Sequence, residues 1–150
     1  MSETARTKAK RALDQTFETL HVDTRGAGLT LITEDVRRWL IEIATLDGLL
    51  TLFIRHTSAS LLIQENADPD VQTDLVNALD RLAPRDAPYL HTIEGDDDMP
   101  AHVRSALTAV NLSIPVSRGH LALGTWQGIY LWEHRHASHS RAVAAHFIGE

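Results

Sequence analysis

The chain has 150 residues, of which 43% are hydrophobic and 23% charged, a composition typical of one soluble domain with a single core. It contains no cysteine, which excludes disulfides, thiolate metal ligands and a cysteine nucleophile, and which fits a cytoplasmic location. The formal net charge of −6 lacks the basic footprint of a general nucleic-acid binder, and no apolar run approaches the roughly 20 residues that span a bilayer. We therefore expect neither a nucleic-acid partner nor a membrane partner.

The first third of the chain predicts two strands, a helix and a buried strand. Residues 1–14 read as a polar tail without the apolar segment of a secretory signal, so the domain is expected to span residues 15–150. Strands are predicted at 17–22, 29–32 and 49–56. Thr33 is the expected N-cap of the helix, because acidic residues follow it and apolar residues then recur at helical spacing (Val36, Trp39, Leu40 and Ile43).

The rest of the chain predicts two more helices and a run of strands. Residues 58–64 continue extended, and Asp68-Pro69 is a helix start with the carboxylate as N-cap. A short helix is expected from Pro100 to Ala109, with His102 in its first turn. Consecutive strands then follow at 112–116, 120–123, 125–135 and 141–148. This order predicts a single compact α+β domain, with a largely antiparallel sheet packed against two or three helices.

A dense polar segment follows the buried strand. His56 lies at the strand end, where a metal ligand, a general base or a histidine bonded only to backbone are all open interpretations. Ser58 and Ser60 share a side if the strand stays regular. Glu65 and Asn66 precede the next helix and have no structural role that the local sequence explains, whereas Asp68 is explained by capping.

A second polar segment runs from His91 to His102 and contains the acidic run Asp96-Asp97-Asp98. The run has the carboxylates that Mg²⁺ prefers, although on spacing alone a solvated loop is the favoured interpretation. His91 and His102 lie eleven residues apart, and two histidines with a carboxylate would suit zinc or another divalent metal.

The C-terminal third adds a glycine-rich segment and a group of histidines. Gln127, Glu133 and Arg135 share one face of a predicted strand, and Glu133 and Arg135 are interpreted either as a structural pair or as a site pair. Arg135 is a candidate phosphate clamp, because guanidinium stays charged and binds in a bidentate manner. His134 and His136 could chelate a metal from one strand face, but a scatter of surface histidines is the favoured interpretation.

Five motifs occur in one order, and together they resemble the YjbQ-like family, also called the secondary thiamine-phosphate synthase enzymes. They are His56-Thr57-Ser58-Ala59-Ser60, Glu65-Asn66-Ala67-Asp68-Pro69-Asp70, Glu94-Gly95-Asp96-Asp97, Met99-Pro100-Ala101-His102 and Leu123-Gly124-Thr125-Trp126-Gln127. The resemblance covers about residues 15–150. It implies a compact α+β fold with a mixed sheet, assembled as a homotrimer with sites near the subunit contacts.

The resemblance also implies a weak transferase activity, thiamine-phosphate synthesis, in which a pyrimidine diphosphate joins a thiazole phosphate and pyrophosphate leaves. The implied catalytic residues are His56, Ser58, Glu65, Asn66, Gln127, Glu133 and Arg135. The implied metal ligands for Mg²⁺ or Zn²⁺ are His56, His91, His102, Asp96 and Asp97. Arg135 or Arg104 would bind phosphate of a small phosphorylated metabolite. Two alternatives stay open: another metal-dependent enzyme acting on a small phosphorylated or anionic metabolite, and a non-catalytic metabolite-binding or regulatory protein.

Overall fold

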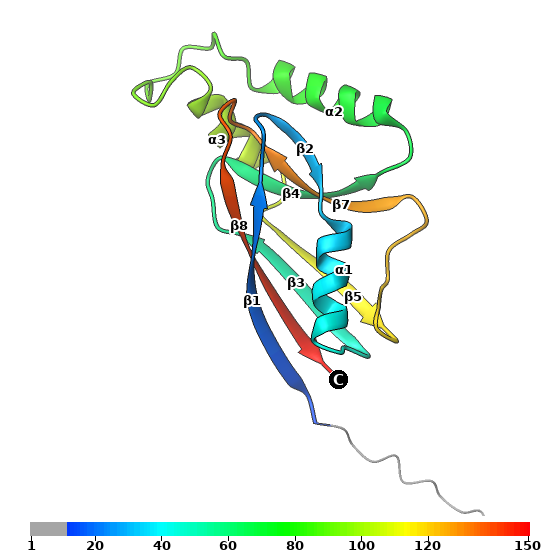
Figure 1. Cartoon of the computed structure of the whole chain (residues 1–150). Coiled ribbons are helices and arrows are strands. Elements are labelled where there is room, and N and C mark those ends of the chain that lie inside the picture. The colour runs from blue at the N-terminus through cyan, green and yellow to red at the C-terminus, as the bar shows by residue number, and fades with distance from the viewer. Residues whose placement is uncertain (1–11) are drawn as a thin grey trace, which may run out of the picture.

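The computed structural model describes residues 12–150 (Figure 1). The predicted N-terminal tail, residues 1–14, lies almost entirely outside the described part, and Asp14 already belongs to the first strand. The elements in chain order are β1 (Asp14–Asp23), β2 (Gly28–Leu31), α1 (Thr33–Glu42), β3 (Gly48–Ile54), β4 (Ala59–Glu65), α2 (Pro69–Leu82), α3 (Asp98–Leu107), β5 (Asn111–Ser117), β6 (His120–Leu121), β7 (Gln127–Glu133) and β8 (Ser140–Gly149).

The strands form two antiparallel sheets. The larger has the order β1-β8-β3-β5-β6, and the smaller has the order β2-β7-β4. Every ladder between the described strands is antiparallel, so these residues show no parallel pair of the kind that a mixed sheet contains. The prediction of a single α+β domain with a largely antiparallel arrangement is confirmed, with the strands divided between two sheets.

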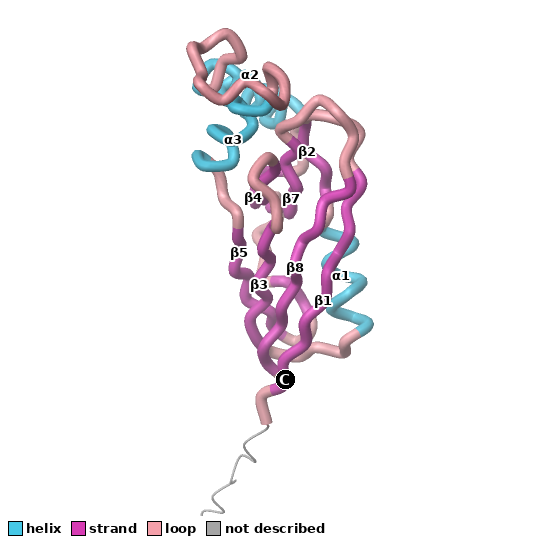
Figure 2. Tube along the Cα trace, turned by 90° about the vertical axis from the view of Figure 1, so that its left-hand side faces the viewer, coloured by secondary structure: helices cyan, strands magenta, loops and turns pink. Residues whose placement is uncertain are grey.

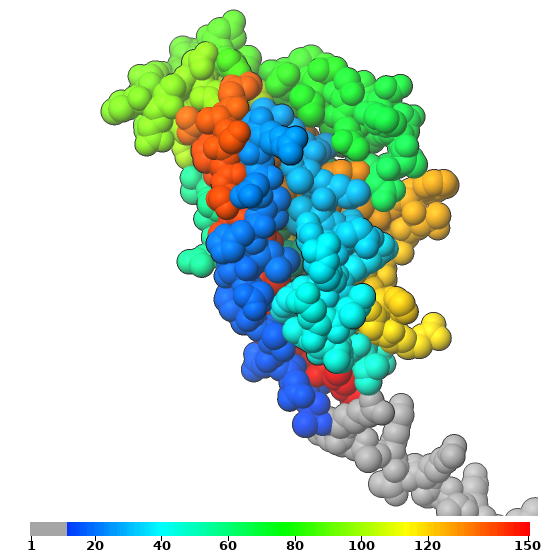
Figure 3. Space-filling model, viewed as in Figure 1, coloured from blue at the N-terminus to red at the C-terminus, as the bar shows by residue number. Residues whose placement is uncertain are grey.

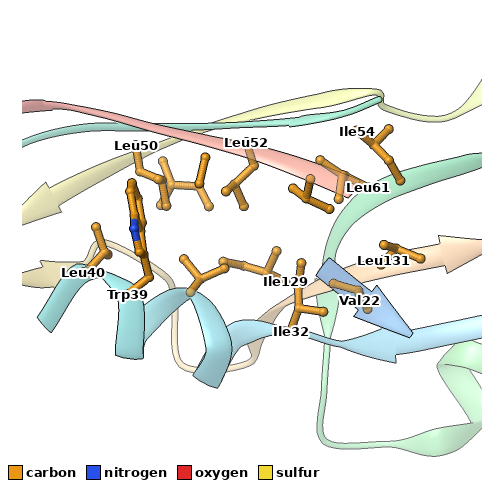
Figure 4. Close-up of a cluster of buried hydrophobic side chains, with 14 of the residues drawn as sticks. Val22, Ile32, Trp39, Leu40, Leu50, Leu52, Ile54, Leu61, Ile129 and Leu131 are labelled. Atoms are coloured by element: carbon orange, nitrogen blue, oxygen red, sulfur yellow. The ribbon is translucent and has the colours of Figure 1, made fainter. Parts of the chain in front are cut away.

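The hydrophobic core lies between the five-stranded sheet on one side and α1 with the three-stranded sheet on the other (Figure 4). On β3, Leu50, Leu52 and Ile54 are buried, whereas Leu49 and Phe53 are exposed. Successive side chains of a strand point to opposite faces, so this alternation places one face of the sheet on the core and leaves the other uncovered within the described chain.

Helix α1 is anchored in a different way from the one predicted. Its N-cap position is Ile32, without a side-chain cap, and Thr33 is the first residue of the helix. Thr33 is buried, and its hydroxyl oxygen accepts a hydrogen bond of 2.9 Å from the backbone N–H of Ile129. The prediction of Thr33 as a cap is therefore wrong, because the hydroxyl joins α1 to β7 across the core instead of closing the helix end.

Helix α2 begins as predicted, with Pro69 as its first residue and the Asp68 carboxylate accepting a hydrogen bond of 2.9 Å from the Asp70 N–H. Helix α3 begins at Asp98, two residues before the predicted start. Gly95 adopts a φ of +105° just ahead of it, a conformation that favours glycine. The earlier start moves His102 into the second turn, one turn after Asp98.

Helices α2 and α3 lie across one end of the strands, away from the C-terminus (Figures 1 and 2). The loop between β7 and β8 reaches the same end beside α3 (Figure 1). On the face that Figure 3 shows, β1 runs alongside α1 below this cap. None of the described helices combines the length and the apolar character that a bilayer crossing requires. The candidate site lies where α3 meets the loop after α2 and the loop between β7 and β8.

Candidate metal centre

Two imidazoles and one carboxylate converge at the start of α3. The Nε2 atoms of His91 and His102 lie 3.0 Å and 3.3 Å from Oδ2 of Asp98. The three potential ligand atoms all lie within 4.8 Å of one another. His91 comes from the loop after α2, whereas Asp98 and His102 lie one turn apart on α3 and therefore on one face of that helix. The helical spacing of Asp98 and His102 therefore brings two of the three candidate ligands together.

Asp98 is held in place by Arg135. Its side chain is about 2% exposed, and its Oδ1 accepts a hydrogen bond of 2.7 Å from Nη1 of Arg135. Its Oδ2 is buried and accepts no hydrogen bond from any described residue. A buried carboxylate oxygen costs free energy unless a proton donor or a cation stabilises it, and the two imidazole nitrogens at ion-pair distance are the described groups beside it.

The hydrogen bonding of His102 directs the lone pair of its Nε2 atom towards Asp98. Its Nδ1 lies 3.0 Å from the carbonyl oxygen of Thr57, which can only accept a hydrogen bond. Nδ1 therefore carries the proton in the neutral ring, and Nε2 carries a lone pair near Asp98 Oδ2. A backbone carbonyl that orients the far nitrogen of a histidine in this way is typical of metal-ligating imidazoles.

The donor set fits zinc better than magnesium. Two ligand atoms about 2.1 Å from one tetrahedral ion are about 3.4 Å apart, close to the two nitrogen–oxygen separations here. Two imidazole nitrogens with one carboxylate oxygen match catalytic zinc sites that keep one position open, and the same set binds non-haem iron. Mg²⁺ prefers oxygen ligands alone. His91 is 45% exposed, so the centre is open on its side.

The other two aspartates of the acidic run are used differently from the prediction. Oδ2 of Asp97 accepts a hydrogen bond of 3.1 Å from Nε of Arg135 and one of 2.9 Å from the His136 N–H. Burial acts to raise the pKa of Asp97, but these two donors outweigh it and hold the pKa below its ordinary value. Asp96 is exposed and lies 3.6 Å from Nη1 of Arg85. Asp98, which was not among the predicted ligands, is the carboxylate that faces the histidines.

Arg135 is not free to clamp a phosphate in this structure. Its guanidinium donates to Asp97, to Asp98 and to the carbonyl oxygen of Glu94, the last at 2.9 Å. Its side chain is mostly buried among these acceptors. The arginine therefore positions the candidate ligand Asp98 and the loop before α3. The predicted pair of Arg135 and Glu133 is joined by one hydrogen bond, which the backbone N–H of Arg135 donates to the Glu133 carboxylate at 3.0 Å.

Glu133 belongs to a separate buried network with Arg141. Nε of Arg141 donates to Glu133 Oε2 at 2.7 Å, and Nη2 donates to Oε1. The Thr24 hydroxyl donates to the same carboxylate at 2.8 Å. Burial acts to raise the pKa of Glu133, but the bonds from Arg141, Arg135 and Thr24 bring it below its ordinary value. The network joins β7 and β8 to the residue that follows β1, and this role is structural.

His56 and Ser58 lie in this network and not at the candidate metal centre. Nε2 of His56 accepts a hydrogen bond of 2.7 Å from the Ala142 N–H, and Nδ1 lies 3.4 Å from Nη1 of Arg141. Burial and the charge of Arg141 lower the pKa of His56. The Ser58 hydroxyl accepts a hydrogen bond of 3.0 Å from Arg141 Nη2. Both nitrogens of His56 thus face hydrogen-bond donors, which opposes the predicted metal-ligand role.

The remaining predicted residues lie at the opposite end of the β4–β7 ladder. Glu65 pairs with Gln127, whereas Ala59 pairs with Glu133, six residues further along. Six residues of a strand correspond to about 20 Å. Gln127 accepts a hydrogen bond of 2.8 Å from the Gly124 N–H and closes the turn before β7. The Asn66 N–H donates to the Trp126 carbonyl at 2.9 Å. The structure of one chain therefore does not bring these residues to the candidate metal centre.

The two neighbouring histidines 134 and 136 do not share a metal-binding face. His134 is only 1% exposed, and its Nε2 lies 2.9 Å from the Ser60 hydroxyl. Burial lowers the pKa of His134 to about 4, with the charge of Arg104 acting in the same direction. His136 follows in the exposed loop after β7. The favoured interpretation of surface histidines is wrong for His134, which is a core residue.

Two residues of these clusters, Asp98 and Arg141, were not among the predicted site residues. Asp98 had a signal, because it stands four residues before His102, the spacing that places two side chains on one helix face. The signal was hidden by the assumed helix start at Pro100. Arg141 had no local signal, since its partners Ser58 and Glu133 are 83 and 8 residues away and only the fold brings them together.

Comparisons with known proteins give one consistent result. Residues 18–150 match the family model described as "UPF0047 protein YjbQ-like". A UPF0047 protein of Synechocystis sp. is 50% identical over 89% of this chain and 91% of its own length, and UPF0047 protein YjbQ of Escherichia coli O157:H7 is 40% identical over 89% and 97%.

Solved structures agree with this. The crystal structure of a conserved hypothetical protein from Thermus thermophilus is 38% identical, covers 85% of this chain and 97% of that one, and has a TM-score of 0.76. A YbjQ-like protein from Sulfolobus solfataricus shares the fold with a TM-score of 0.84 over 93% of this chain and all of that one, at 21% identity.

Proposed function

The chain belongs to the UPF0047 YjbQ-like family, and from the geometry of its candidate metal centre we propose that it is an enzyme that uses one divalent metal ion to act on a small phosphorylated or anionic metabolite. One observation carries the proposal. The buried Oδ2 of Asp98 accepts no hydrogen bond from the described residues, yet it lies 3.0 Å and 3.3 Å from two imidazole nitrogens. A cation between these atoms would satisfy all three at once.

The residues of the centre divide into ligands and supports. His91, Asp98 and His102 would hold the ion. Arg135 binds Oδ1 of Asp98 and leaves Oδ2 for the ion, and the Thr57 carbonyl fixes the proton of His102 on Nδ1. When bound, a Zn²⁺ ion with an open position polarises phosphoryl or carbonyl oxygens and lowers the pKa of a coordinated water towards 7. The exposed side of His91 leaves room for a substrate to approach.

Metal binding tests the proposal directly. Apo-protein prepared with a chelator is titrated calorimetrically with Zn²⁺ and with Mg²⁺, and metal content is measured on protein purified without chelator. We expect one Zn²⁺ per chain and at least hundredfold weaker binding in Asp98→Asn, because one of three ligands loses its charge. Asp96→Asn is the matched control, since this neighbouring carboxylate lies outside the three ligands. Equal zinc affinity in the two variants, or no zinc binding by the wild type, would refute the proposal.

Thiamine-phosphate synthesis is a narrower candidate within the same class. Both of its substrates are phosphorylated, which suits the substrate class, but pyrophosphate departure favours a hard cation on oxygen ligands, and this centre offers two nitrogens. The assay is pyrophosphate release from the pyrimidine diphosphate with the thiazole phosphate. Turnover within the usual enzyme range of about 1–1000 per second would favour it, whereas far slower turnover would mark the reaction as incidental. Stoichiometric zinc without turnover of phosphorylated metabolites would favour a binding or regulatory protein.

Assembly as a homotrimer is also part of the proposal. Phe17, Leu49, Phe53 and Ile148 are exposed, and they lie on the face of the five-stranded sheet opposite the core. Exposed apolar patches of this kind mark interaction surfaces. Light scattering after gel filtration is expected to give three times the 16.6-kDa chain mass. Phe53→Ser should shift the mass towards the monomer, and Ile41→Ser, on the exposed side of α1, should not. A monomeric wild type would contradict the assembly.

A further inference from the structure

A hollow is lined by residues of α2, α3 and two loops. These two helices lie at one end of the molecule (Figure 1). The hollow has a volume of about 300 Å³, near the lower limit of ordinary small-ligand sites. It is lined by residues of four segments: Asp80 from the last turn of α2, Pro84 and Arg85 from the loop that follows, Arg104 from α3 and His136 from the loop after β7. None of these residues is a candidate metal ligand.

The hollow is rich in hydrogen-bond donors. Nη2 of Arg104 donates to Asp80 at 2.8 Å and to the Ala83 carbonyl at 3.2 Å, which fixes the guanidinium. Nε of Arg104 is buried and has no hydrogen-bond partner among the described residues. The single carboxylate of the lining, Asp80, already accepts a bond from Arg104. The lining therefore combines two arginines and a histidine with one acid that is already hydrogen-bonded.

The partner of Arg85 is easily replaced. Its Nη1 lies 3.6 Å from Asp96, and the two side chains are 44% and 75% exposed. An ion pair this long and this exposed contributes little stability. An oxyanion that enters the hollow would meet a guanidinium that is held only loosely, together with the fixed guanidinium of Arg104.

Neighbouring segments of the chain carry the hollow and the candidate metal centre. The backbone N–H of His136 donates to Asp97, and Arg135, the residue before it, binds the ligand Asp98. Asp96, which pairs with Arg85, stands two residues before Asp98, in the loop that leads into α3. A ligand in the hollow would therefore contact residues that stand next in sequence to, or pair with, the residues around the centre.

We propose that this hollow binds a phosphate group of the substrate. Guanidinium groups match the oxygens of phosphate in geometry and charge, and charge-assisted bonds of this kind are the stronger ones. The inference rests on the proposed function and names its substrate class: a metabolite whose phosphate sits in the Arg85–Arg104 hollow while another part reaches the candidate metal centre.

The test is a titration of inorganic phosphate into the full-length protein, with and without zinc, followed by NMR or calorimetry. We expect saturable binding that weakens at least tenfold in Arg85→Gln and in Arg104→Gln. Arg38→Gln is the matched control, because Arg38 also forms an exposed ion pair, with Asp35 at 3.4 Å on α1, but does not line the hollow. It should change the affinity less than twofold. Arg85 is a surface residue, so its variant remains informative if Arg104→Gln unfolds.

Three results would overturn the inference. They are an absence of phosphate binding, an equal weakening of phosphate binding in Arg38→Gln, and phosphate binding that requires zinc and is unchanged in Arg85→Gln, which would place phosphate on the ion.

Asp98→Asn separates this inference from the proposed function. If Asp98→Asn binds zinc as the wild type does while phosphate binding still depends on Arg85, the metal proposal fails and the anion site stands. If zinc binding depends on Asp98 and phosphate binding is absent, the metal proposal stands and the anion site fails.

Discussion

Acidification from pH 7 to pH 4.5 is expected to destabilise the folded protein by about 2.4 kcal/mol through His134 alone. His134 is 1% exposed and is hydrogen-bonded to the fully buried Ser60, and its pKa falls from an ordinary 6.5 to about 4. Burial is the main cause, because the charged imidazolium would lose its hydration, and the positive charge of Arg104 adds to it.

The sign and the size follow from proton uptake. Below pH 6.5 the unfolded chain takes up a proton on His134, whereas the folded chain does so only near pH 4. The free energy of unfolding therefore falls as the pH drops between these values, by up to about 1.4 kcal/mol per pH unit for one proton. Between pH 7 and pH 4.5 this amounts to about 2.4 kcal/mol, and above pH 7 the contribution of His134 to the pH dependence vanishes.

The assay is urea unfolding of the wild type and His134→Gln at half-unit steps between pH 7.5 and pH 4.5, with chelator present so that bound metal does not contribute. Glutamine cannot titrate, so the stability advantage of the wild type over the variant should shrink by about 2 kcal/mol as the pH falls. His120→Gln, at an exposed position, controls for the loss of an imidazole as such. A difference between wild type and His134→Gln that stays constant within about 0.5 kcal/mol would refute the reasoning, since burial would then not be opposing protonation.

Three further substitutions test the fold around the site. Glu133→Gln leaves the buried Arg141 without its charged partner and should cost about 3–5 kcal/mol in urea unfolding; a cost below about 1 kcal/mol would show that the pair is not buried as described. The lowered pKa of Glu133 means that its stabilisation is complete above its ordinary value of 4.5 and is lost as the pH falls through the lowered pKa, a trend that the variant should lack. Gly48→Ala should lower the melting temperature by several degrees, because a Cβ would overlap the carbonyl oxygen of Ile148, and an unchanged melting temperature would speak against this register. Leu52→Ala removes a fully buried side chain and should cost about 2–5 kcal/mol, whereas a loss under about 1 kcal/mol would place Leu52 outside the core.

The parts of the fold that depend on neighbouring residues were predictable. Asp68 and Pro69 start α2 because a capping carboxylate and a restricted φ act within two residues of each other. The alternation of buried and exposed side chains in β3 follows from strand geometry, so the inward Leu50, Leu52 and Ile54 are an intrinsic property of that segment. Thr33 shows the limit of such reasoning, because its hydroxyl bonds to Ile129, 96 residues away, rather than to its own helix.

The candidate site was predictable only in outline. The sequence marked His91, His102 and a run of three aspartates, but three adjacent carboxylates are chemically alike. Asp98 differs from Asp96 and Asp97 through its place one turn before His102 and through its contact with His91 from the loop after α2. The remaining predicted residues were spread over two ends of a ladder, because strand pairing, and not nearness in sequence, sets which side chains meet.

The sequence by itself determined the kind of domain, the capped start of α2, the faces of β3 and, through its ordered motifs, the family. The tertiary structure decided which carboxylate faces the two histidines, that His56 and Glu133 serve a buried arginine instead, and that Arg85 and Arg104 line one hollow. The physical reason is the separation along the chain over which each interaction acts. Capping and strand alternation act over a few residues, whereas the partner of a buried charge is whichever group the packed chain brings within about 3 Å.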